Sequence, residues 1–71
     1  MFIKSPEYYG LIVKRIRINS NITQQQLSKK VGINRTTISL IEQGKANISI
    51  TTAIKILSIL GYEMEVKING E

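Results

Sequence analysis

Residues 23–45 read TQQQLSKKVGINRTTISLIEQGK, a stretch in which one glycine separates two short helical patterns. Thr23 is expected to cap the first helix, because Gln26 three residues later completes a capping box. Gly32 ends that helix, since glycine adopts the left-handed conformation at little cost. Asn34 is expected to cap the second helix with its side-chain oxygen. This order of helix, tight turn and helix is the helix-turn-helix pattern, in which the second helix reads DNA.

Apolar residues at helical spacing supply a core for these two helices and for two more. Ser5 and Pro6 predict the start of a helix that runs to about Asn19. Ser49 predicts the cap of a last helix that ends at Gly61. The side chains expected to face inward recur every three or four positions. They are Tyr9, Ile12, Val13, Ile16, Leu27, Val31, Ile33, Ile38, Ile41, Ile50, Ala53, Ile54, Leu57 and Leu60.

The hydrophobic period changes after Gly61. Apolar and charged side chains alternate over residues 62–68, which is the pattern of a β-strand. The apolar members of this strand are Tyr62, Met64, Val66 and Ile68. A lone strand leaves backbone N–H and C=O groups unpaired, so it needs a partner. Residues 1–4 of the same chain are one candidate, but we favour the same strand of a second copy, antiparallel across a two-fold axis.

Composition favours a nucleic-acid partner and excludes several kinds of site. Ten Lys and Arg residues against five Asp and Glu residues give a net charge of +5. A basic surface suits nucleic acid, although an anionic membrane or an acidic protein would also fit. The chain has no Cys and no His, which excludes disulfides, zinc fingers and thiol or histidine chemistry. We expect no cofactor, no metal and no catalytic residue. With no signal peptide and no membrane span, the expected location is cytoplasmic, associated with the nucleoid through DNA.

The exposed start of the second helix carries short hydrogen-bonding side chains and one arginine. Arg35 is the strongest candidate for reading a base, because its fork can bind O6 and N7 of a guanine together, a contact that discriminates by about 1–3 kcal/mol. Gln24, in the first turn of the preceding helix, could donate to a DNA phosphate, although it could equally be an ordinary exposed glutamine. Thr37 could contact a phosphate or only cap its helix.

A resemblance to the XRE/Cro/C1-type helix-turn-helix repressors of phages and bacteria extends from about Tyr9 to Leu60. It is carried by Arg17, Thr23, Gln24, Leu27, Val31, Gly32, Thr37, Ile38, Ser39, Glu42 and Gly44. The resemblance implies a mainly α, lambda-repressor-like helix-turn-helix bundle of four to five helices. Ser5 and Pro6 before the first helix, together with the final strand, look like the HipB-like antitoxins, which pair with HipA-type kinases.

The resemblance also implies roles at matched positions. Base contacts are implied for Arg35, Thr36 and Ser39, and DNA phosphate contacts for Gln24, Asn34, Thr37, Lys45 and Asn47. Arg17 and Glu42 are expected to form a buried or half-buried ion pair between the first and third helices. Dimer contacts are expected from Tyr62, Met64, Val66 and Ile68.

One domain is expected to cover residues 1–71, with the helix-turn-helix at 23–43 and the strand at 62–68. The leading hypothesis is a homodimer that binds a palindromic double-stranded DNA operator and represses its own promoter. It would also be the antitoxin of a HipA-like Ser/Thr kinase toxin, made of one chain or of a split pair. The alternatives are a stand-alone phage-like repressor without a toxin, and a protein-interaction module whose basic face only aids solubility. No enzyme activity is expected.

Overall fold

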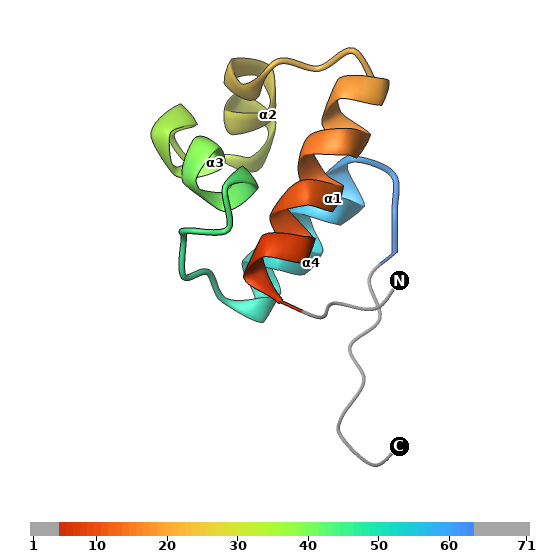
Figure 1. The fold of residues 1–71 in the computed structure, drawn as a ribbon. Coiled ribbons are helices and arrows are strands. Elements are labelled where there is room, and N and C mark those ends of the chain that lie inside the picture. The colour runs from red at the N-terminus through yellow and green to blue at the C-terminus, as the bar shows by residue number, and fades with distance from the viewer. Residues whose placement is uncertain (1–4, 64–71) are drawn as a thin grey trace.

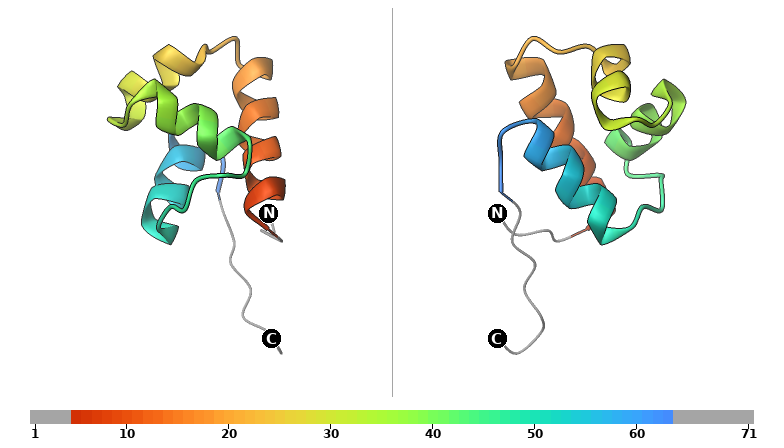
Figure 2. Two further views of the ribbon diagram at one scale, coloured as in Figure 1. Left: turned by 60° about the vertical axis from the view of Figure 1, so that its left-hand side comes forward. Right: turned by 180° about the vertical axis from the view of Figure 1, so that it is seen from behind.

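The computed structural model describes residues 5–63 of the 71-residue chain. This part of the chain forms four helices: α1 (Pro6–Asn19), α2 (Gln24–Val31), α3 (Arg35–Glu42) and α4 (Ile50–Ile59) (Figure 1). α1 packs on α3, α3 on α2, and α2 on α4 (Figure 2). None of these four helices is long and apolar enough to cross a membrane. The expected mainly α fold is confirmed, and residues 5–63 hold four helices where four to five were expected for the chain.

Each helix begins at a capping side chain that the sequence identified. The capping oxygen accepts a hydrogen bond from the backbone N–H three residues later, and the caps are Ser5, Thr23, Asn34 and Ser49. At Thr23 the capping box is complete, because the Gln26 side chain accepts from the Thr23 backbone N–H at 2.8 Å. Gly32 has a φ of +86°, the left-handed conformation that ends α2.

The core lies between all four helices. Its buried apolar side chains are Tyr9, Val13, Ile16, Leu27, Val31, Ile38, Ile41, Ala53, Ile56, Leu57 and Leu60. Ile12 and Ile33 pack against it while partly buried, as expected. Burying one Leu or Ile side chain stabilises a fold by about 1.5–3 kcal/mol, so this cluster is the main source of folding free energy.

The prediction for the inward face of α4 was wrong at two positions. Ile50 is 55% exposed and Ile54 is 42% exposed, whereas Ile56 is completely buried. The last helix is apolar on most sides, so a stripe beginning at Ile50 and a stripe beginning at Ala53 both satisfy helical spacing. Packing against the other helices selects the second stripe, which leaves Ile50 and Ile54 on the surface.

The predicted strand over residues 62–68 lies outside the described residues from Met64 onward. Tyr62 and Glu63, which the structure does describe, follow the turn after α4 and are not in a strand. The Tyr62 side chain is half exposed.

α1 and α3 approach each other closely at Gly10. This glycine is buried within α1, and a Cβ placed on it would overlap the Ile41 carbonyl oxygen and lie 2.9 Å from the Glu42 carbonyl oxygen. A glycine inside a helix is less stable than alanine by about 0.5–1 kcal/mol, so its presence here has a packing reason. Only a residue without a side chain allows the two backbones to come this close.

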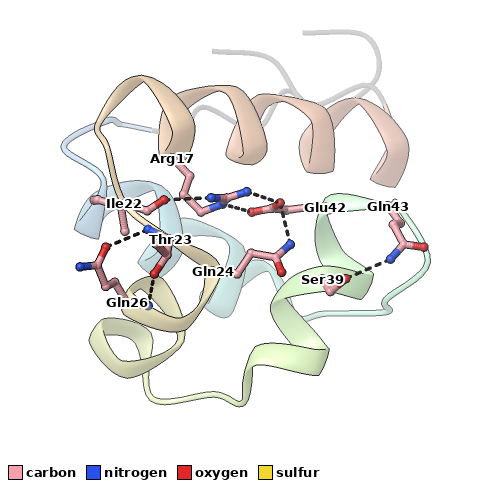
Figure 3. A network of polar contacts seen from close by, with 8 residues as sticks. All are labelled: Arg17, Ile22, Thr23, Gln24, Gln26, Ser39, Glu42 and Gln43. Carbon is pink, nitrogen blue, oxygen red and sulfur yellow. Dashed lines mark hydrogen bonds and ion pairs between the residues drawn. The ribbon is translucent and has the colours of Figure 1, made fainter.

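A salt bridge crosses the same interface, between the helices expected from the sequence. The Arg17 Nε donates to Glu42 Oε2 at 2.6 Å and its Nη2 donates to Oε1 at 3.0 Å (Figure 3). The Arg17 Nη1 donates to the Ile22 carbonyl at 2.9 Å, which ties the α1–α2 loop to the pair. The side chains are 11% and 3% exposed, respectively, so both charges are largely removed from water.

Tyr9 links α1 to α4. Its hydroxyl donates a buried hydrogen bond of 2.8 Å to the Ala53 carbonyl. Burial raises the pKa of Tyr9 far above its usual range, because the phenolate would lose its hydration. The folded protein therefore strongly prefers the protonated form of this side chain.

We expect Tyr9→Phe to lower the free energy of unfolding by about 0.5–1.5 kcal/mol, because it removes one buried hydrogen bond without leaving a cavity. Since the folded-state pKa is raised, unfolded Tyr9 ionises first. The advantage of the wild type over Tyr9→Phe should be constant below about pH 9 and shrink above about pH 10. Urea unfolding of both proteins between pH 7 and 11 measures this difference, and a constant difference up to pH 11 would contradict it.

We expect Glu42→Ala to lower the free energy of unfolding by about 3–5 kcal/mol, because it leaves the Arg17 guanidinium buried without its counter-charge. Glu63→Ala, which removes an exposed carboxylate, is the matched control and should change stability by less than about 0.5 kcal/mol. The double variant Arg17→Met/Glu42→Leu should regain much of the loss, since no charge is left stranded. A Glu42→Ala protein with an unchanged denaturation midpoint would show that the pair contributes nothing to stability.

Candidate nucleic-acid interface

α3 divides into an inner and an outer face. Ile38, Ile41 and Glu42 are buried against the rest of the domain. What we call the outer face of α3 consists of Arg35, Thr36, Ser39 and Leu40, together with Gln43 just after the end of the helix. Ser39 is half-buried and the others are exposed. Thr37 is half-buried and lies between the two faces. No other described helix covers this side of α3 in the view that brings it forward (Figure 2, left). All three predicted base contacts therefore lie together on one accessible surface.

At the start of α3, Asn34 and Thr37 are bound to each other. The Asn34 Oδ1 accepts from the Thr37 backbone N–H at 2.8 Å and from the Thr37 hydroxyl at 2.9 Å. Thr37 therefore takes part in the cap of its helix, which was the alternative to a phosphate contact. Its only hydroxyl proton is already donated to Asn34. The Asn34 amide nitrogen is the better donor for a phosphate at this end of the helix.

Gln43 belongs to the outer face although the sequence pattern did not identify it. Its Nε2 donates to the Ser39 hydroxyl oxygen at 3.1 Å, one helical turn earlier (Figure 3). Ser39 is thereby the acceptor in this contact, and its own hydroxyl proton can be donated elsewhere. The spacing of four residues between Ser39 and Gln43 is the signal that could have found it.

Gln24, the predicted phosphate contact at the start of α2, is half-buried rather than fully exposed. Its Nε2 donates to Glu42 Oε1 at 3.1 Å, so it joins the Arg17–Glu42 pair (Figure 3). An amide nitrogen carries two protons, and one remains for a second acceptor such as a phosphate oxygen. No spacing rule links Gln24 to Glu42, which are 18 residues apart and meet only through the packing of α2 on α3.

The other predicted contacts are spread around this surface. Lys45 and Asn47 are exposed in the loop between α3 and α4. Within residues 5–63, no group of three or more His, Cys, Asp or Glu side chains is placed to hold a metal ion. The arrangement suits binding of a polyanion by hydrogen bonds and positive charge.

Comparison with known proteins agrees with this geometry. Residues 13–67 match the family model described as helix-turn-helix. Antitoxin HipB of Escherichia coli K12 is 39% identical over 62 residues, which cover 87% of this chain and 70% of HipB.

Solved structures show the same likeness in three dimensions. A chain of the HipA–HipB–O2–O3 complex matches with a TM-score of 0.77 and 36% identity, over 94% of each chain. The restriction-modification controller protein C.Esp1396I, solved as a tetramer with its natural 35-base-pair operator, matches with a TM-score of 0.72 and 31% identity. That match covers 78% of this chain and 72% of the controller. This chain belongs to the helix-turn-helix family of DNA-binding transcription regulators.

Proposed function

We propose that this protein is a homodimeric repressor of its own promoter and the antitoxin of a HipA-type kinase. The main support for the DNA-binding part of this proposal is the outer face of α3, where Arg35, Thr36 and Ser39 are accessible together. The inner face of the same helix is fixed by a buried ion pair. A helix that presents hydrogen-bonding side chains on a rigid support is what reading base edges requires.

The contacts divide into two chemical roles. Arg35, Thr36 and Ser39 are the proposed base contacts. The proposed phosphate contacts are Gln24, Asn34, Thr37, Lys45 and Asn47. Gln24 supports this division, because Glu42 holds its amide at the edge of the interface while one N–H remains to donate. Contacts to phosphates fix the position of a protein on the duplex, and contacts to base edges select the sequence.

A second copy of the chain is the proposed partner for the strand over residues 62–68. The exposed Ile50 and Ile54 support a dimer, because they form an apolar side of α4 that a monomer leaves in water. A domain of this size buries only about 60% of the surface of its unfolded chain, so a dimer also adds needed burial. Two α3 helices would then lie about 34–36 Å apart, one turn of DNA, on a near-palindromic operator.

The antitoxin role is supported by the likeness to HipB, which extends over 94% of this chain in the HipA–HipB–O2–O3 complex. A stand-alone regulator without a toxin is the second candidate, and it is supported by the likeness to the controller protein C.Esp1396I. Footprinting on the DNA upstream of the gene, with and without a neighbouring kinase-like protein, separates the two. A kinase that binds this protein and strengthens protection favours the antitoxin, and the absence of any such neighbour favours the stand-alone regulator.

We expect Arg35→Ala and Gln24→Ala to weaken DNA binding in different ways. Arg35→Ala should weaken operator binding by about 1–3 kcal/mol and relax the choice of base at particular positions. Gln24→Ala should weaken binding to the operator and to random DNA about equally. Titration of both duplexes measures the difference, and Gln25→Ala, an exposed neighbour of the same type, is the control. Equal losses on operator and random DNA for both variants would refute the division of roles.

We expect a chain that ends before Tyr62 to be a monomer with weak binding to single half-sites, because the proposed seam is removed. Sedimentation and footprinting of the truncated and full chains test this, and helical circular dichroism checks that the truncated chain is folded. If the truncated chain sediments as a dimer and protects both half-sites, the strand is not the seam.

A further inference from the structure

Leu40 is the one apolar side chain on the outer face of α3. It is 39% exposed, and the rest of the outer face of α3 consists of Arg35, Thr36, Ser39 and Gln43. A single exposed leucine is common on protein surfaces and by itself has no meaning. The position of Leu40 is unusual, because every neighbour on the same face can donate or accept a hydrogen bond.

Helical geometry places Leu40 beside Thr36 on the outer face of α3. The buried residues of α3 are Ile38, Ile41 and Glu42. A turn of 100° per residue directs Leu40 to the side opposite Ile38 and Glu42. Thr36 lies one turn before Leu40, so the two side chains share one row along the helix. A helix that inserts Thr36 into a groove therefore brings Leu40 close to the same part of the groove floor.

The floor of the DNA major groove offers one large apolar group. Every base edge presents a donor or an acceptor in this groove, and thymine carries a methyl group on C5 in addition to its O4 acceptor. A leucine placed against a donor or acceptor would exclude water from that atom without replacing the hydrogen bond, which is unfavourable. A leucine placed against the thymine methyl buries two apolar groups together, which is favourable.

We propose that Leu40 is a specificity-determining residue that contacts the 5-methyl group of a thymine in the major groove. The proposal rests on DNA binding through α3, as put forward above, and adds one base preference to it. Thymine is selected at this position by apolar contact, while Arg35 selects its base by hydrogen bonds.

Deoxyuridine provides a direct test, because it differs from thymidine only by lacking that methyl group. The probe is the tightest duplex that the full chain selects from a random-sequence pool. Each thymine of this duplex is replaced in turn by deoxyuridine, and the dissociation constant is measured for the wild type and for Leu40→Ala. At one thymine in each half-site, we expect removal of the methyl group to weaken wild-type binding by about fourfold. The same removal should have almost no effect on Leu40→Ala.

Leu11→Ala is the matched control, because Leu11 is a 48% exposed leucine on α1 and lies outside the outer face of α3. The ratio of affinities for thymine and uracil duplexes should be the same for Leu11→Ala as for the wild type. Circular dichroism should show unchanged helix content for both leucine variants, since each side chain is exposed.

Three outcomes overturn the proposal while leaving the operator function intact. The selected duplex binds tightly but no deoxyuridine substitution weakens it, or the same substitutions weaken the wild type and Leu40→Ala equally. In the third, Leu40→Ala binds DNA like the wild type and instead loses binding to a protein partner. If no duplex is selected at all, the proposed DNA-binding function itself fails, and that result is distinct from the other three.

Discussion

The buried carboxylate of Glu42 is the interaction on which the rest of the domain depends. Three N–H groups reach it, two from Arg17 and one from Gln24, so the donors come from α1 and α2 while the acceptor is on α3. A carboxylate this deeply buried is unfavourable by several kcal/mol unless it is paired and hydrogen-bonded. The pairing fixes the positions of three helices relative to one another, and it cancels the negative charge of the buried carboxylate.

The same interface needs a close approach of two backbones, and Gly10 permits it. Without a side chain at this position, α1 lies directly against the carbonyl groups of Ile41 and Glu42 at the end of α3. The last turn of α3 is therefore held by α1 in two ways, through backbone packing at Gly10 and through the Arg17 guanidinium. The support for α3 thus comes from its inner face, and the side chains of the outer face contribute little to the packing.

The exposed apolar side chains of this protein suit different kinds of contact, depending on where they lie. Ile50 and Ile54 lie on α4, which has an apolar sequence on most sides, and they suit burial against a second copy of the chain. Leu40 lies alone among hydrogen-bonding side chains on α3, so it suits a small apolar group rather than a broad interface. The distinction comes from the neighbours of each residue, because the exposed fractions themselves are similar.

The sequence by itself determined the four helix starts, the turn at Gly32 and most of the core. These features depend on residues close together in the chain: a capping oxygen three residues before its partner, a glycine after the last turn, apolar groups at helical spacing. It also determined the Arg17–Glu42 pair, but only through matched positions in a known family. The tertiary structure alone decided which apolar stripe of α4 faces the core. It alone also decided the hydrogen bond from Gln24 to Glu42 and the need for glycine at position 10. Each of these depends on which residues distant in the chain come into contact, and local spacing carries no information about that.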